Sequence, residues 1–474
     1  MKVTKLDLGG GDMETRIERD SMGEVRVEGD KLWGAQTQRS LDNFRIGKER
    51  MPIEVILALA SIKKASARAN GSLGVLAPEK VAAISEASDA ILRRELDEQF
   101  PLSVWQTGSG TQSNMNVNEV IANYASAKAG RPLGSKEPLH PNDDVNRSQS
   151  SNDVFPAAMQ LSAGLKIKGE LLPAAAALQA TLASKAREFG TIVKTGRTHM
   201  QDAVPITLGQ EFSGYAEQLR LGMGRVQTAL DGILNLPLGG TAVGTGLNSP
   251  HGFASLVCGE LSSICGLDIV PAANKFAYMA AHDDLVQLSG TLNSLATALM
   301  KIGNDIRLMG SGPRCGLGEL ILPENEPGSS IMPGKVNPTQ VEALTMVCAQ
   351  VFGNHATISF AGASGQLELN AFKPVIIFDL LQSIDLLTGA MRSFEERCVR
   401  GIVADEKRIG TALGGSLMVA TVLVPSLGYD TVARVARYAH ENNLSLKEAL
   451  VNLELMTAGR FDELVRPGEM VKEP

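Results

Sequence analysis

Aromatic residues are scarce in this 474-residue chain. Only 4% of its residues are Phe, Trp or Tyr, although 44% are hydrophobic, so the apolar volume comes mainly from Ala, Leu, Val and Ile. That composition favours closely packed helices over sheets rich in aromatic side chains. Because the chain is too long for one simple core, we expect a mainly α-helical protein of more than one domain.

Clustered cysteines and a targeting segment are also missing. The five cysteines are odd in number and form no Cys-x-x-Cys pair, which excludes a disulfide framework or a zinc site and indicates a reducing compartment. The N-terminus has no apolar signal segment, and it carries Asp7, Asp12 and Glu14, which a transit peptide would avoid. We therefore expect a cytoplasmic protein.

A positive charge balance and a long uninterrupted apolar run are absent too. The net charge of −7 argues against nucleic acid as a partner, because phosphate binding needs a basic face. The best membrane-span candidate, 285–300, is interrupted by Gln287, Ser289, Asn293 and Ser294, so we expect no membrane partner. If the substrate is an anion, the positive charge must be local to its pocket.

The clearest helical pattern lies between residues 285 and 309. Its apolar positions alternate steps of three and four, which is a repeat of 3.5 residues and indicates a supercoiled bundle. These positions are Leu285, Leu288, Leu292, Leu295, Leu299, Ile302, Ile306 and Met309. The other faces of this helix are also rather apolar, which predicts a core helix surrounded by neighbours, some of them from other subunits.

Four polar stretches rich in Ser, Thr, Asn and His each adjoin a long helix. They are 107–118, which we interpret as a loop, 140–153, 194–202 and 328–338. One alone would be an ordinary loop, but four in a helical protein suggest that helix ends meet at a shared polar site. The same pattern suggests three domains, 1–149, 150–404 and 405–474. Capping boxes are predicted at Thr207 with Gln210 and at Ser445 with Glu448.

The stretch 328–338, here called the signature loop, suits a small anion. Gly328 and Ser329 leave the backbone free to bend, a Met-Pro-Gly turn follows, and Lys335 and Asn337 then supply a cation and an amide. The plainer alternative is a Gly/Pro turn between two helices.

The chemistry that fits these residue types is proton abstraction next to a carboxylate. It requires a base, donors that stabilise the aci-carboxylate intermediate, and an acid for the leaving group. Lys335 and Asn337 suit the second role, and His199 suits acid or base work near neutral pH. Ser329 would need activation, by loop closure that surrounds its oxygen with N–H dipoles.

Six stretches resemble class II fumarate hydratases of the aspartase/fumarase superfamily, and they occur in the same order. They are Thr107–Glu119, His140–Asp143, Gly196–His199, Leu236–Gly246, Gly328–Gln340 and Phe461–Pro467. The resemblance implies a three-domain fold whose long central helical bundle is completed in a homotetramer, with active sites shared between subunits. It also implies a metal-independent hydro-lyase of the citric acid cycle that adds water to fumarate in the anti sense, giving L-malate, without a cofactor.

The resemblance also implies residue roles. Ser329 matches the base, and His199, oriented by Glu342, matches the second acid/base group. The positions that match ligands of the dicarboxylate substrate are Ser109, Thr111, Asn114, Ser150, Ser151, Asn152, Thr198, Lys335 and Asn337. His140, Asn142 and Asp143 match a second anion site near the entrance. There the family often has a basic residue three positions before the histidine, where this chain has Glu137.

Several candidates have simpler interpretations. His140 with its neighbouring aspartates lacks metal-ligand spacing, so a turn is expected. His282 with the two aspartates after it is expected to begin a helix, and Lys373 is expected to be solvated.

Two other function classes remain open. An ammonia-lyase such as aspartase tends to have Ala at the Gly334 position and Asn at the His140 position, and to lack Thr339-Gln340, so this sequence departs from it at each. A helical binding or structural protein that kept the fold would have lost Ser329, His199 or Lys335, all of which are present.

Overall fold

The computed structural model describes residues 15–471, and the acidic positions Asp7, Asp12 and Glu14 lie outside them. Most described residues are helical and the sheets are all two-stranded, so the predicted mainly α class is confirmed. The chain forms two compact units. Unit 1 comprises the described residues up to Leu171, Arg225–Asn293 and Gln350–Leu386. Unit 2 comprises Leu172–Gly224, Ser294–Ala349 and the described residues from Leu387. The three-domain division remains a prediction.

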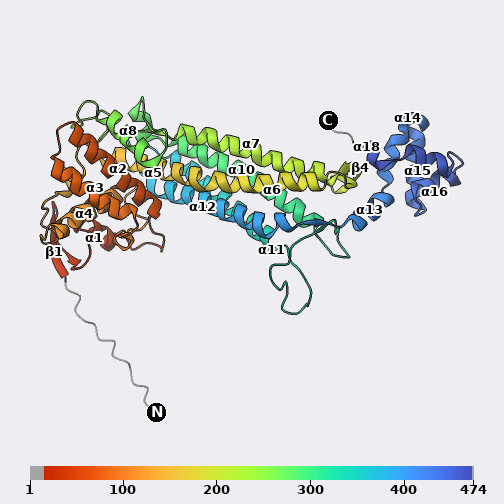
Figure 1. Cartoon of the computed structure of the whole chain (residues 1–474), viewed down its shortest axis with the longest axis horizontal. Coiled ribbons are helices and arrows are strands. Elements are labelled where there is room, and N and C mark those ends of the chain that lie inside the picture. The colour runs from red at the N-terminus through yellow and green to blue at the C-terminus, as the bar shows by residue number, and fades with distance from the viewer. Residues whose placement is uncertain (1–14, 472–474) are drawn as a thin grey trace, which may run out of the picture. The chain divides into compact units, whose positions relative to one another are not determined.

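Unit 1 is built around one central helix. Helix α2 packs against α3, α5 and α8, and its Val55, Leu59 and Ile62 are fully buried. Helix α4 also contacts α2, and α1 lies against α4 (Figure 1). The elements within unit 1 are β1 (Thr15–Asp20), β2 (Gly23–Glu28), α1 (Ala35–Asn43), α2 (Ile53–Ser72), α3 (Pro78–Leu92), α4 (Thr111–Lys128), α5 (Ser151–Lys166), β5 (Asn235–Leu236), α8 (Phe253–Cys265), β6 (Val270–Pro271) and α9 (Lys275–Ala280).

Unit 2 contains an antiparallel hairpin and the C-terminal helices. Strand β3 contacts α13, while β4 contacts α18 and a 3₁₀ turn at Leu417–Leu423, so the hairpin is supported by its own unit. The elements within unit 2 are α6 (Leu172–Glu188), β3 (Val193–Thr198), β4 (Gln201–Thr207), β7 (Leu320–Ile321), β8 (Val403–Ala404), α13 (Glu406–Gly415), α14 (Val424–Leu427), α15 (Tyr429–Glu441), α16 (Leu446–Asn452), α17 (Ala458–Leu464) and α18 (Pro467–Met470).

Four long helices have residues in both units: α7 (Leu208–Gly232), α10 (Asp283–Met309), α11 (Thr339–Gly362) and α12 (Lys373–Arg397). All eight seam positions predicted between Leu285 and Met309 are buried in α10, so the helix and its core face are confirmed. The capping box before α7 is confirmed as well, because Thr207 and Gln210 exchange backbone-to-side-chain hydrogen bonds of 3.0 Å.

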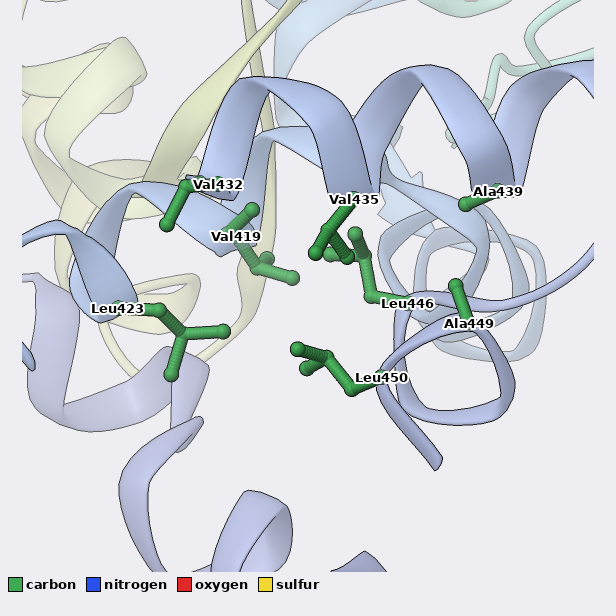
Figure 2. Close-up of a cluster of buried hydrophobic side chains, with 9 residues drawn as sticks. Val419, Leu423, Val432, Val435, Ala439, Leu446, Ala449 and Leu450 are labelled. Carbon is green, nitrogen blue, oxygen red and sulfur yellow. The ribbon is translucent and has the colours of Figure 1, made fainter. Parts of the chain in front are cut away.

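The C-terminal helices have a small core of their own (Figure 2). Val419 and Leu423 from the 3₁₀ turn face Val435 of α15 and Leu450 of α16, and all four are buried. The predicted capping box of α16 is present at Ser445. This local core is compatible with a separate C-terminal domain.

Three expectations from the sequence were wrong. Residues 111–118 belong to α4 and not to a loop, because their asparagines find buried hydrogen-bond partners along the helix. Lys373 is fully buried, not solvated, and its ammonium donates to the carbonyl oxygen of Asn370 at 2.8 Å.

The third is the choice of 285–300 as the best candidate for a membrane span. Within residues 15–471, the helix Lys373–Gly401 is the one long and apolar enough to cross a membrane. However, 56% of the apolar 18-residue stretch in this helix is buried by the rest of the chain, which is typical of a helix in a protein core.

Candidate active site

The first predicted site segment is a tight loop that leads into α4. Ser109 and Thr111 lie there with their hydroxyl oxygens 2.9 Å apart. The backbone N–H of Lys373 donates to the Gly108 carbonyl at 3.0 Å. A Cβ on Gly108 would lie 1.5 Å from the carbonyl oxygen of Ala371, so only glycine allows this approach. The close contact fixes the loop that presents the two hydroxyls.

The second segment, residues 146–152, is here called the binding strap. Ser150 caps α5, because its hydroxyl accepts the N–H of Asn152 at 3.2 Å. Ser151 and Asn152 follow at the positive end of the helix dipole, where an anion is favoured. Asn114 of α4 donates from Nδ2 to Ser151 Oγ at 3.0 Å, which joins the first two predicted segments.

Asp153 anchors the binding strap to the glycine-rich stretch 237–246. Its Oδ1 accepts the N–H of Ser150 at 2.9 Å, and its Oδ2 accepts the N–H groups of Gly239 and Thr241 at 3.0 Å each. Burial raises the pKa of Asp153 to about 6, although these three N–H groups oppose the shift. Asn152 adds a bond from Nδ2 to the Ala242 carbonyl at 2.8 Å. The glycine-rich motif therefore serves to hold the strap.

A buried lysine that the sequence reasoning missed lies behind the strap. Lys63 of α2 is fully buried and donates to Asn146 Oδ1 at 2.9 Å and to Gln149 Oε1 at 3.0 Å. Burial lowers its pKa to about 7, and the charge of Asp153 partly offsets that effect. The sequence signal that could have identified Lys63 as buried is its position on the apolar face of α2.

His199 lies at the tip of the β3–β4 hairpin. Thr198 pairs with Gln201 in the antiparallel register, so His199 and Met200 form the two-residue turn. Both have positive φ, 55° and 63°, as a type I′ hairpin turn requires. The turn leaves Thr198 and His199 exposed to solvent, where they can meet a ligand.

A buried charge network holds this hairpin in place. Lys194 Nζ lies 2.7 Å from Glu211 Oε2 and 2.9 Å from Glu319 Oε2, and Arg197 Nη1 lies 2.8 Å from Glu319 Oε1. Glu319 also accepts a backbone hydrogen bond from Asp405 at 2.9 Å. Glu319 therefore connects β3, through its carboxylate, with the start of the C-terminal segment, through its backbone carbonyl.

The signature loop runs between α10 and α11 (Figure 1). Ser329 Oγ accepts backbone N–H groups from Ile331 at 3.3 Å and Met332 at 3.1 Å. Asn337 Nδ2 donates to the Gly328 carbonyl, which closes the base of the loop. Residues 324–336, with Lys335 among them, surround a hollow of about 400 Å³. Its volume is large enough for a small dicarboxylate.

The predicted site residues fall into two groups within one chain. Ser109, Thr111, Asn114 and the binding strap belong to unit 1, whereas Thr198, His199, the signature loop and Glu342 belong to unit 2. Glu342 is exposed in the first turn of α11. Among the described residues, no hydrogen bond joins it to His199. The pairing of these two side chains thus stays a prediction for the assembled protein.

The second predicted anion site is a separate cavity of about 150 Å³ in unit 1. His140 Nδ1 accepts the N–H groups of Asn142 at 3.2 Å and Asp143 at 3.1 Å, so a neutral ring carries its hydrogen on Nε2. Arg19 and Lys136 line the cavity together with His140 and Asn142, and so do the acidic residues Glu18, Asp20 and Glu119. A basic side chain thus lies one position before Glu137, and the anion site itself stays a prediction. Across residues 15–471, no three His, Cys, Asp or Glu side chains are grouped as metal ligands.

Known families match this chain over most of its length. A model of the lyase family matches residues 23–353, and a model described as the fumarase C C-terminus matches residues 419–472. The class II fumarate hydratase 2 of Bradyrhizobium diazoefficiens is 55% identical over 97% of both chains. The mitochondrial fumarate hydratase of Rattus norvegicus is 54% identical over 96% of this chain and 90% of its own.

A solved structure matches equally well. The class II fumarase of Schistosoma mansoni superposes with a TM-score of 0.95 at 45% identity, covering 96% of this chain and 99% of that one. A 3-carboxy-cis,cis-muconate lactonizing enzyme of Pseudomonas putida, at 20% identity and a TM-score of 0.70, shares the fold alone.

Proposed function

This chain belongs to the class II fumarate hydratases, and on that premise we propose that the residues described above form its catalytic site. The protein is a lyase that adds water reversibly to fumarate, giving L-malate. The observation that carries the site assignment is the hydroxyl of Ser329, which accepts two backbone N–H groups above a hollow that also contains Lys335.

In the direction from malate, Ser329 first releases its hydroxyl proton to solvent. The resulting alkoxide then takes the proton from the carbon next to one carboxylate and becomes a hydroxyl again. Two N–H dipoles at its oxygen favour negative charge there before the transfer. The electron pair of the broken C–H bond moves into that carboxylate, forming the aci-carboxylate. The C–OH bond then breaks on the opposite face, and a proton delivered from His199 completes a molecule of water. Glu342 orients the imidazole in the assembled protein.

Lys335 and Asn337 stabilise the charge that develops on the aci-carboxylate. The other substrate ligands are the hydroxyl and amide groups of Ser109, Thr111, Ser150, Ser151, Asn152 and Thr198, which present donors without adding charge. Asn114 is fully buried, and both of its N–H bonds are used, to Ser151 and to Asn146. It therefore supports binding by holding Ser151. These steps use protein groups alone.

The second anion site lies in the cavity with His140, Asn142 and Asp143. Its positive charge comes from Lys136 and Arg19 in place of a basic residue at Glu137. Glu18 and Asp20 in the same lining are paired with Arg16 and Arg39, and Glu119 accepts backbone N–H groups. The ring of His140 offers its Nε2 hydrogen to an anion, because Nδ1 is occupied by two backbone donors. A second molecule of a small dicarboxylate is the ligand that fits this chemistry.

The functional assembly is a homotetramer with active sites shared between subunits. Two observations support it: the catalytic and binding residues lie in different units, and large apolar side chains are exposed in one chain. Phe360 is 72% exposed and Leu367 is 90% exposed, which is unusual for a surface without a partner. The expected location is the cytoplasm, because the five cysteines remain unpaired thiols.

The test is to add the purified protein, treated with a chelator, to L-malate and separately to L-aspartate. Absorbance from the conjugated double bond of fumarate should grow only from malate. Growth only from aspartate would replace this proposal with the ammonia-lyase alternative. If neither L-malate nor L-aspartate gives an increase in absorbance with the folded tetramer, the non-catalytic alternative holds.

A further inference from the structure

The contacts behind the binding strap fix the direction of a chain of hydrogen bonds. Asn146 Nδ2 lies 3.2 Å from the backbone carbonyl of Gln149, which can only accept. The nitrogen of this amide must therefore point there, and its Oδ1 must face inward. Lys63 donates to that oxygen at 2.9 Å and Asn118 Nδ2 at 3.3 Å, so the same orientation is required from the opposite side, with the ammonium as its only charged donor. The amide of Asn146 cannot be flipped without losing these bonds.

Gln149 is fixed in the same way. Its Nε2 donates to the carbonyls of Val145 at 3.2 Å and Arg147 at 3.0 Å, so Oε1 faces Lys63. A single buried ammonium thus holds both side-chain amides of the strap. Within residues 15–471, Lys63 forms no ion pair with a carboxylate, so these two amides are its principal partners.

The orientation of Asn146 in turn fixes which atoms donate and which accept at Asn114 and Ser151. Because Asn146 Oδ1 is an acceptor, the atom of Asn114 that lies 3.2 Å from it must be Nδ2. The second hydrogen of that nitrogen goes to Ser151 Oγ at 3.0 Å. Ser151 is therefore an acceptor toward the protein interior. Among the described residues, its own hydroxyl hydrogen has no acceptor and is available to a ligand.

We propose that Lys63 is a positioning residue that, through Asn146 and Asn114, makes the Ser151 hydroxyl a hydrogen-bond donor to a carboxylate of the substrate. This inference rests on the proposed function, which supplies a dicarboxylate as the ligand. With the opposite direction of bonds, Ser151 would point its hydrogen inward and its lone pairs at the anion, which repels it. The lysine thus supplies the charged contact, beside the Gln149 carbonyl and Asn118, that sets the polarity of a group it does not touch.

The test compares Lys63→Met with Lys64→Met, the same change at the next position of α2. Lys64 instead pairs with Asp89, away from the strap, so it is a matched control. Lys63→Met should raise the KM for L-malate roughly 10-fold or more with a smaller effect on kcat, because it misplaces a binding group. Lys64→Met should leave KM unchanged. Equal KM values for the two variants would overturn the proposal.

A double-mutant cycle separates positioning from general damage. In a Ser151→Ala background, Lys63→Met should change KM by no more than about 2-fold, because the group through which it acts is already gone. A purely structural role would instead raise KM by the same factor in both backgrounds. If Lys63→Met does not fold, Asn146→Ala interrupts the same chain and enters the same cycle.

Crystal structures of the parent and of Lys63→Met give a readout that does not need turnover. The Asn114 Nδ2 to Ser151 Oγ contact should be present in the parent and absent in the variant. An unchanged contact refutes the proposal whatever the kinetics show. If the parent itself does not act on malate, the proposed function fails, while the comparison of the two structures still decides the role of Lys63.

Discussion

Lys194 and Glu319 form an ion pair of 2.9 Å in which each residue is only 1% exposed. The pair lies beneath the hairpin that carries His199, and Glu319 also binds Arg197 on the same strand. Charge this deeply buried costs free energy unless every partner is present. The hairpin and the residue at its tip thus depend on one carboxylate far along the chain.

Glu319→Gln should destabilise the protein strongly. The change leaves Lys194 and Arg197 buried with less compensating charge, and breaking a buried pair costs about 3–5 kcal/mol. Thermal unfolding midpoints would show the loss, and turnover should fall with it because His199 loses its support. Glu217→Gln, which breaks the exposed pair with Arg220, is the control and should leave the unfolding midpoint close to that of the parent. Similar midpoints for both variants would mean that the network does not support the hairpin.

Ser329→Ala should reduce kcat by about 10²- to 10⁴-fold while changing KM little, since the lost group acts in the transition state. Steady-state kinetics with L-malate and fumarate would measure both constants. Ser330→Ala, at the next and more exposed position, should behave like the parent. Near-normal turnover in Ser329→Ala would remove the serine from its role as base. Lys335→Ala should impair both binding and turnover.

Mixing two impaired variants should restore activity if sites are shared between subunits. Ser151→Ala damages the binding strap of unit 1, and Ser329→Ala damages the signature loop of unit 2. When denatured variants are mixed and refolded together, about a quarter of the sites should receive both intact residues from different subunits. Assays of mixed and separately refolded samples would measure the gain. If the mixture stays as inactive as its components, both residues come from one chain.

His282 should make the protein less stable in acid. Burial, reinforced by the charge of Lys373, lowers its pKa from 6.5 to about 3. Between these values the unfolded chain binds more protons than the folded one, so the free energy of unfolding falls as the pH falls through this window. The slope for one group is at most about 1.4 kcal/mol per pH unit. Asp153 and Asp379, whose pKa values burial raises to about 6, act in the opposite direction.

The measurement is therefore a difference between variants. In His282→Asn, thermal midpoints from pH 4 to 7 should decline less steeply toward acid than in the parent. His251→Asn, at an exposed position, should follow the parent curve. Parallel curves for all three proteins would show that His282 does not contribute to the pH dependence.

Periodicity and local capping could be predicted from the sequence because they depend on neighbours along the chain. The seam of α10 and the Thr207–Gln210 box are examples, and both are present as expected. The signature loop and its hydroxyl were also identifiable. Lys63 and Lys373 were not, because a lysine in a helix is normally solvated and only the three-dimensional fold shows that it is enclosed. The helical start at Thr111 was missed for a related reason. A sequence rich in asparagine is typical of a loop, and only the structure shows that these asparagines are buried with hydrogen-bond partners.

The position of Lys136 has a consequence for how variants of this protein are compared. A residue-by-residue alignment would record Glu137 as the loss of a basic group and would score the second anion site as defective. The backbone at Lys136, with a φ of 58°, instead places this side chain in the wall of the same cavity. If an anion binds in this cavity as proposed, a one-residue shift of the charge along the chain keeps a cation in the cavity wall although the aligned position has lost one.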